Sequence, residues 1–120
     1  MAKILIADDH RANRDALAAL LEVAGHYVLS ANDGHQALNL AREHQPELVI
    51  SDVLMPQMDG YELTRRLKLE PATAGISVVF YTAYFGSQDA KQLAQALGVA
   101  DVLVKPSDND VILRAVDKVL

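Results

Sequence analysis

The sequence predicts an open three-layer α/β sandwich in which helices cover both faces of a parallel five-stranded sheet. Five short apolar runs alternate with five segments whose apolar residues recur at helical spacing. Several of these runs are continuously aliphatic, as strands are when both of their faces are covered by helices. The 120 residues divide into five strand-helix units of roughly 24 residues, and five units are too few for an eight-stranded barrel.

The strands and helices follow from the two periods of the apolar residues. The expected strands are Ile4–Ala7, Tyr27–Leu29, Leu48–Ile50, Val78–Tyr81 and Val102–Val104. Helical spacing joins Leu17, Leu20, Leu21 and Ala24; Ala37, Leu38 and Ala41; Leu63 and Leu67; Leu93, Ala94 and Leu97; and Ile112, Ala115, Val116 and Val119. This strict alternation predicts right-handed crossovers between parallel strands.

Polar residues mark where three of the helices begin. Asp33 precedes Gln36 by three residues, Asp59 stands three before Glu62, and Ser107 stands three before an acid, so each is an expected N-cap. The expected helix stops are Gly25, Gly75, Gly98, Pro46 and Pro71.

Composition narrows the possible functions. The 11 basic and 16 acidic side chains give a net charge of −5, which disfavours direct contact with nucleic acid. The absence of cysteine excludes a disulfide scaffold, a thiolate zinc site and a cysteine nucleophile. The apolar runs are too short to cross a membrane, and acids follow the first run directly, unlike a signal peptide. We therefore expect a single cytoplasmic domain, either a complete small protein or one domain of a longer chain.

Polar side chains that carry chemistry follow four of the five strands. Asp8 and Asp9 come after the first strand, Asp52 after the third, Thr82 after the fourth and Lys105 after the fifth. Because ligands of open parallel sheets bind at the carboxyl ends of the strands, we expect these five residues to converge on one edge.

Three carboxylates at one edge repel one another. Two of them about 4 Å apart cost on the order of 4 kcal/mol at an effective dielectric of 20, and Mg²⁺ would remove that penalty. A carboxylate beside Mg²⁺, a lysine and a hydroxyl suits phosphoryl transfer through an aspartyl phosphate. The simpler alternative is that the acids cap helices or solvate strand ends. His10, which follows the acids, is interpreted as a loop residue and not as a ligand.

These motifs together carry a family resemblance. The sequence resembles the receiver domain of two-component response regulators from the first strand to the last helix, and the expected domain spans residues 1–120. The matching stretches are Ile4–Asp9, Asp52–Gly60, Thr82–Ala83 and Lys105–Pro106. The resemblance implies a flavodoxin-like (βα)5 fold, a three-layer sandwich with strand order 2-1-3-4-5.

The resemblance also implies roles for the acids. Asp52 would be the phosphoacceptor, and its partner would be a histidine kinase or a histidine phosphotransfer protein. Asp9 would bind Mg²⁺ directly, Asp8 largely through water, and the backbone carbonyl of Leu54 would be a further metal ligand. The phosphoryl group would change the conformation of the domain and so regulate an attached or partner output, which the sequence does not identify.

The resemblance also implies roles for the residues at the ends of the fourth and fifth strands. Thr82 and Lys105 would contact the phosphoryl oxygens, and the bond before Pro106 would be cis. One position departs from the family pattern: Val102 stands where receiver domains usually carry an aromatic residue, so the usual ring movement cannot transmit the signal.

The resemblance also implies that two further positions tune the lifetime of the phosphate. Leu54 stands two residues after Asp52, and Tyr84 stands two residues after Thr82. Neither side chain can orient an attacking water as an acid or amide could, so we expect slow hydrolysis.

Other functions on similar folds are weighed against this one. A degenerate receiver could serve as a docking module without chemistry. A phosphohydrolase with an aspartate nucleophile would need a second acid where Leu54 stands, and a flavin or nucleotide carrier would need a phosphate-binding loop where Asp8 and Asp9 stand. The chain is therefore expected to promote its own phosphorylation and dephosphorylation without being an enzyme in its own right, and a homodimer remains open.

Overall fold

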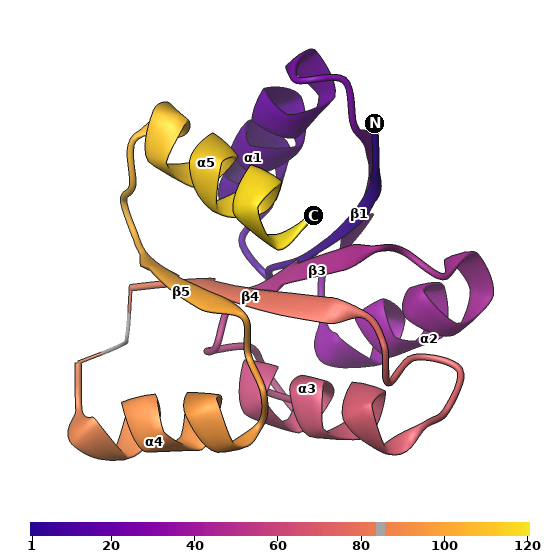
Figure 1. The fold of residues 1–120 in the computed structure, drawn as a ribbon, viewed down its shortest axis with the longest axis vertical. Helices are drawn as coiled ribbons and strands as arrows, with labels where there is room; N and C mark the ends of the chain where they lie inside the picture. The colour runs from indigo at the N-terminus through magenta and orange to yellow at the C-terminus, as the bar shows by residue number, and fades with distance from the viewer. Residues whose placement is uncertain (84–85) are drawn as a thin grey trace.

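Five strands and five helices alternate along the chain (Figure 1). The computed structural model describes residues 1–83 and 86–120. The elements are β1 (Lys3–Ala7), α1 (Arg11–Val23), β2 (Tyr27–Ala31), α2 (Gly34–His44), β3 (Leu48–Ser51), α3 (Gly60–Leu69), β4 (Ser77–Thr82), α4 (Gln88–Ala96), β5 (Asp101–Val104) and α5 (Asn109–Val119). Each expected strand is present. The observed strands begin up to one residue earlier or end up to two residues later than the apolar runs, because backbone hydrogen bonding continues past the aliphatic side chains.

The strands form one parallel sheet in the order β2-β1-β3-β4-β5. The register pairs Ala7 of β1 with Ser51 of β3 and Thr82 of β4 with Val104 of β5. The predicted fold class and strand order are therefore confirmed. This register places the residues that follow β1 and β3 side by side at one edge of the sheet.

Helices cover both faces of the sheet. Helices α1 and α5 lie on one face and α2, α3 and α4 on the other (Figure 1). Alternate residues of β1 serve the two faces: Ile4 and Ile6 pack with α1 and α5, whereas Leu5 and Ala7 pack with the opposite helices. The accessible surface is 6326 Å², close to the roughly 6,300 Å² that surface scaling predicts for this mass. Among the described residues, no helix is long and apolar enough to cross a bilayer.

Two of the three predicted helix caps are confirmed. The carboxylate of Asp33 accepts the backbone N–H of Gln36 at 2.7 Å, and that of Asp59 accepts the N–H of Glu62 at 2.8 Å. The prediction for Ser107 is wrong, because α5 begins after Asp108. The hydroxyl of Ser107 instead donates to the carbonyl of Val104 at 2.7 Å.

Two residues of the predicted helical stripes are exposed to solvent. Ala24 is exposed because α1 ends before it. Leu93 of α4 is 43% exposed, and Ala94 is the buried residue of that helix. Helix α4 therefore covers its face of the sheet with a single small buried side chain.

Candidate functional site

Backbone hydrogen bonds carry the sheet one residue past the ends of β1 and β3. The N–H of Asp8 donates to the carbonyl of Ala31 at 3.1 Å, and the N–H of Asp52 donates to the carbonyl of Ala7 at 2.9 Å. Both aspartates are consequently fixed at the sheet edge and nearly buried, with exposed fractions of 5% and 7%. The convergence expected from the sequence is confirmed for this pair.

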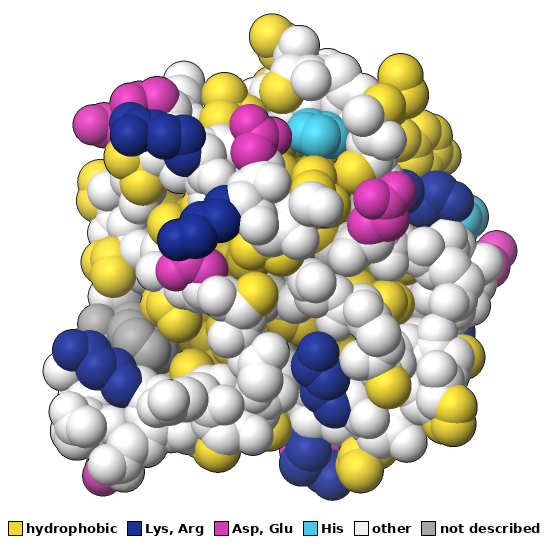
Figure 2. All heavy atoms as spheres, in the orientation of Figure 1, with side chains coloured by type: hydrophobic (Ala, Val, Ile, Leu, Met, Phe, Trp, Pro, Cys, Tyr) yellow, Lys and Arg dark blue, Asp and Glu magenta, His cyan; other side chains and the backbone are white. Residues whose placement is uncertain are grey.

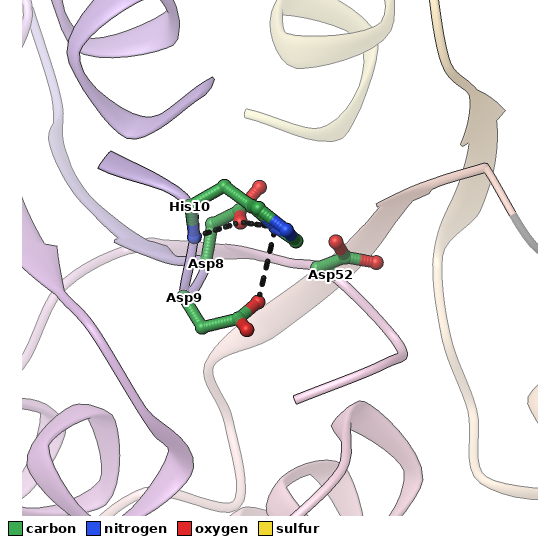
Figure 3. Close-up of side chains that lie close together, drawn as sticks. All are labelled: Asp8, Asp9, His10 and Asp52. Atoms are coloured by element: carbon green, nitrogen blue, oxygen red, sulfur yellow. Dashed lines mark hydrogen bonds and ion pairs between the residues drawn. The ribbon is translucent and has the colours of Figure 1, made fainter. Parts of the chain in front are cut away.

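Four side chains gather at this edge (Figure 3). Asp8, Asp9, His10 and Asp52 each offer one ligand atom, and these four atoms all lie within 4.8 Å of one another. We call this group the acidic cluster. Its members come from the ends of two neighbouring strands, as the sequence predicts. The presence of the His10 ring among them differs from the prediction that His10 is a loop residue and not a ligand.

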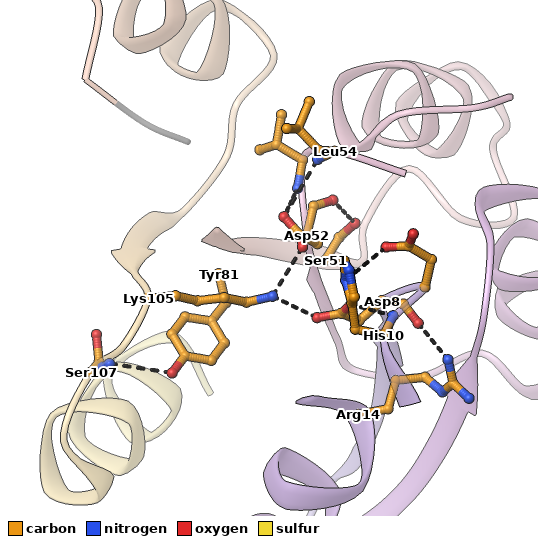
Figure 4. Close-up of polar contacts among 11 residues, drawn as sticks. Asp8, His10, Arg14, Ser51, Asp52, Leu54, Tyr81, Lys105 and Ser107 are labelled. Carbon is orange, nitrogen blue, oxygen red and sulfur yellow. Dashed lines mark hydrogen bonds and ion pairs between the residues drawn. The ribbon is translucent and has the colours of Figure 1, made fainter. Parts of the chain in front are cut away.

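Lys105 bridges two carboxylates of the acidic cluster. Its Nζ donates to Oδ2 of Asp8 at 2.7 Å and to Oδ2 of Asp52 at 2.9 Å (Figure 4). The backbone N–H of Lys105 donates to the carbonyl of Thr82 at 2.9 Å, so the end of β5 is tied to the end of β4. The acidic cluster contains three carboxylates, two of which accept from this ammonium, and negative charge therefore remains in excess.

Opposing effects act on the pKa of Lys105. Burial disfavours the charged ammonium and lowers the pKa, but the hydrogen bonds and charges of Asp8 and Asp52 outweigh it and raise the pKa above its usual value. Lys105 is therefore a permanent cation at neutral pH and partly offsets the repulsion between the two acids.

Tyr81 and Arg14 contact the residues of this ion pair. The Nζ of Lys105 lies 5.5 Å from the centre of the Tyr81 ring, within reach of a cation–π attraction. The hydroxyl of Tyr81 accepts the N–H of Ser107 at 3.3 Å, and Arg14 of α1 donates to the backbone carbonyl of Asp8 at 2.9 Å. Sequence reasoning missed both residues, although Tyr81 stands in β4 directly before Thr82.

The acidic cluster contains an oxygen that suits a cation. Oδ1 of Asp9 is a buried oxygen without a hydrogen-bond partner, although Nδ1 of His10 lies 3.3 Å away, within ion-pair distance. A buried anionic oxygen without a donor is costly, and a hard divalent ion satisfies such an oxygen directly. The oxygen-rich donor set therefore fits Mg²⁺.

The loop after β3 wraps closely around Asp52. Oδ1 of Asp52 accepts the N–H of Val53 at 2.7 Å and that of Leu54 at 3.4 Å. Gly60, at the start of α3, approaches so closely that an added Cβ would lie 2.5 Å from the Asp52 carbonyl oxygen. No side chain fits at position 60 without a shift of this loop, and the Leu54 side chain is left 50% exposed at the rim of the site.

The remaining predicted residues occupy the other side of the site. Thr82 ends β4 and is fully buried, and the Lys105–Pro106 peptide bond is cis, as expected. Val102 lies in β5 and packs in part against the core. The prediction for Tyr84 falls outside the described residues.

Comparison with known proteins agrees with this geometry. Residues 4–117 match the family model described as the response regulator receiver domain. The chain is 37% identical over 120 residues to Protein PilH of Pseudomonas aeruginosa, covering all of this chain and 98% of PilH. It is 42% identical over 114 residues to the response regulator PleD of Caulobacter vibrioides, covering 95% of this chain but 25% of PleD.

Solved structures show the same likeness. The structure of the chemotaxis protein CheY4 of Vibrio cholerae superposes with a TM-score of 0.94 at 32% identity and covers 100% of this chain and 99% of CheY4. The receiver domain of a signal transduction histidine kinase from Syntrophus aciditrophicus superposes with a TM-score of 0.90 at 31% identity, covering 100% of this chain and 90% of that one. The family match, the sheet order and the acidic cluster agree, and the chain belongs to the response regulator receiver domain family of two-component signalling.

Proposed function

We propose that this chain is a phosphoacceptor signalling module in which Asp52 receives a phosphoryl group from a histidine of a partner protein. The observation that carries the proposal is the nearly buried Asp52 carboxylate, held 2.9 Å from the Lys105 ammonium beside Asp8 and Asp9. An Asp52 oxygen would attack phosphorus, the bond from phosphorus to the donor imidazole nitrogen would break, and that nitrogen would keep the electron pair. An acyl phosphate results.

The donor set supports a Mg²⁺ site within the acidic cluster. Asp9 and Asp52 would hold the ion directly with the backbone carbonyl of Leu54, and Asp8 would act largely through water. When bound, the ion supplies positive charge that offsets the negative charge of the incoming phosphoryl oxygens. The unpartnered Oδ1 of Asp9 is the feature of this chain that favours a cation most directly.

The neighbouring side chains have proposed roles toward the phosphoryl group. Lys105 donates to Asp8 and Asp52. After phosphorylation, its ammonium would donate to a phosphoryl oxygen in place of one of these carboxylates. The hydroxyl of Thr82 would contact a second oxygen from the end of β4. Leu54, half exposed at the rim, would restrict the in-line approach of water, as would Tyr84.

The scope of the proposed function follows from the family. Residues 1–120 would act as one receiver domain in the cytoplasm. The donor would be a histidine kinase or a histidine phosphotransfer protein, and the effector would be an attached domain or a partner protein. On the face drawn in Figure 2, single basic side chains stand among acidic and uncharged ones, and we propose no direct contact with nucleic acid.

Phosphorylation by a small-molecule donor tests this function without a partner kinase. The protein is incubated with acetyl phosphate and Mg²⁺, and its intact mass is measured. We expect the mass of one phosphoryl group on the wild type and none on Asp52→Asn. Asp89→Asn, which changes an exposed acid of α4, is the matched control and should be phosphorylated normally. Undiminished modification of Asp52→Asn would overturn the assignment, and lack of modification of the wild type would favour a docking module.

A further inference from the structure

His10 occupies a place in the acidic cluster that the proposed function does not use. Its Nδ1 lies 3.3 Å from Oδ1 of Asp9 and 3.5 Å from Oδ1 of Asp8. The His10 ring is 67% exposed, whereas Asp8 and Asp52 are buried, so His10 forms the solvent side of the cluster.

The backbone fixes His10 over the two acids. Its N–H donates to Oδ1 of Asp8 at 2.9 Å, and its carbonyl accepts the N–H of Arg14 in the first turn of α1 at 3.0 Å. His10 is the N-cap of α1, yet its side chain makes no capping hydrogen bond. The imidazole is therefore directed to the carboxylates while the backbone alone begins the helix.

The spacing of these atoms matches that of two ligands on one ion. Zinc binds histidine nitrogen and carboxylate oxygen at about 2.0–2.2 Å, so two of its ligands in tetrahedral geometry lie roughly 3.4 Å apart. The two separations of Nδ1 from carboxylate oxygens, 3.3 and 3.5 Å, fall on either side of that value. In addition, Oδ1 of Asp9 accepts no hydrogen bond, so this oxygen is available to bind an ion.

We propose that His10 is an additional nitrogen ligand of the acidic cluster, through which the site binds borderline transition ions such as Zn²⁺ as well as Mg²⁺. This inference rests on the metal site of the proposed function and names a ligand beyond it. Carboxylate, carbonyl and water oxygens suit Mg²⁺, whereas imidazole nitrogen suits zinc, nickel and copper. His10 should therefore add affinity for Zn²⁺ and little for Mg²⁺.

A pair of titrations separates these two contributions. Zn²⁺ and Mg²⁺ are each titrated calorimetrically into the wild type, His10→Ala and His35→Ala. His35 is an exposed histidine on α2 and serves as the matched control. We expect His10→Ala to weaken Zn²⁺ binding at least tenfold and to change Mg²⁺ binding less than twofold, and His35→Ala to change neither.

Ring nitrogen signals identify the ligand atom. In long-range proton–nitrogen NMR spectra, Zn²⁺ should move the Nδ1 signal of His10, and Mg²⁺ should leave it in place. Asp9→Ala should weaken binding of both ions, since both use the same carboxylates. An unchanged Zn²⁺ affinity in His10→Ala would overturn the inference. An equal change for both ions would also overturn it, because it would show that His10 acts through charge alone.

Phosphorylation in the absence of Zn²⁺ separates this inference from the proposed function. The wild type and His35→Ala, whose substituted residue lies on α2 outside the acidic cluster, should both be phosphorylated at Asp52 by acetyl phosphate and Mg²⁺. Failure of the wild type to bind Mg²⁺ or to be phosphorylated would count against the proposed function. A Zn²⁺ affinity that does not depend on His10 would count against this inference while the phosphorylation stands.

Discussion

At the carboxyl ends of the strands, the region around β1 and β3 is more deeply buried than the region around α4 and β5. Strand β3 is buried along its whole length, and β1 is buried from Ile4 to Ala7. On the other side, β5 has one buried residue, Val104 is 49% exposed, and α4 buries Ala94. The acids that follow β1 and β3 are thus placed by an apolar core, whereas α4 and β5 each have a single buried residue.

Under the proposed function, this difference would divide chemistry from response. Phosphoryl transfer needs carboxylates at fixed positions, and the buried strands hold Asp8 and Asp52 at such positions. A conformational response needs a region whose local opening costs little, which is a property of segments with few buried apolar contacts. Under the proposed function, the phosphoacceptor chemistry would lie at the ends of β1 and β3 and the response on α4 and β5.

The largest effect should come from the metal. If Mg²⁺ binds the acidic cluster, an ion concentration 100 times its dissociation constant adds about 2.7 kcal/mol to the free energy of unfolding. Asp9→Ala should lose most of that gain, whereas Asp89→Ala on α4 should keep all of it. Thermal unfolding with and without Mg²⁺ is the measurement, and an unchanged gain in Asp9→Ala would place the ion elsewhere.

The same substitution on the two sides tests the contrast in packing. Val49 of β3 is fully buried, and Val104 of β5 is 49% exposed. Val49→Ala removes buried methyl groups and leaves a cavity, so it should lower the free energy of unfolding by about 2.5 kcal/mol. Val104→Ala should stay within about 0.5 kcal/mol of the wild type. Equal losses in urea unfolding would refute the contrast.

Substitution of Gly60 tests how tightly the loop after β3 packs against Asp52. A Cβ there would lie 2.5 Å from the Asp52 carbonyl oxygen and 2.9 Å from the Val53 Cα, whereas a Cβ at Gly75 meets no atom within 4 Å. Gly60→Ala should therefore cost about 2 kcal/mol of stability. Gly75→Ala should be neutral or slightly stabilising. Chemical denaturation of both variants compares them, and a neutral Gly60→Ala would mean that the loop yields easily.

The smallest expected effect concerns the lifetime of the phosphate. Leu54→Asn places an amide that can orient water at the rim of the site, and we expect about tenfold faster dephosphorylation, equivalent to about 1.4 kcal/mol in the barrier. Decay of the phosphorylated mass over time measures the rate. Equal rates for wild type and variant would show that the Leu54 side chain does not gate water.

Sequence reasoning worked best where one physical requirement determined the pattern. Burial between two helical layers makes β1 and β3 continuously aliphatic, so their ends, and with them Asp8 and Asp52, could be located. The same periodicity was less informative for α4, where Leu93 keeps helical spacing yet is 43% exposed. Spacing reports which residues share a helix face, but not how much of that face the sheet covers.

Contacts between distant segments could not be read from the sequence. The hydrogen bonds of Lys105 to Asp8 and Asp52 join residues 97 and 53 positions apart, and their distances depend on the register of four strands. Ser107 failed as a cap because its hydroxyl donates back to Val104, a local alternative open to any serine near a strand end. The approach of His10 to the acids depends on the backbone turn into α1, which no side-chain pattern reveals.

The central claim is that the Asp52 carboxylate forms the acyl phosphate. Borohydride reduces an acyl phosphate to the alcohol and so converts the modified aspartate to homoserine, which tandem mass spectrometry of peptides locates. After treatment with acetyl phosphate and Mg²⁺, we predict homoserine at position 52 and unchanged aspartate at positions 8 and 9, with conversion abolished when Mg²⁺ is chelated. Homoserine at Asp8 or Asp9, or conversion at Asp52 that persists without Mg²⁺, would contradict the account.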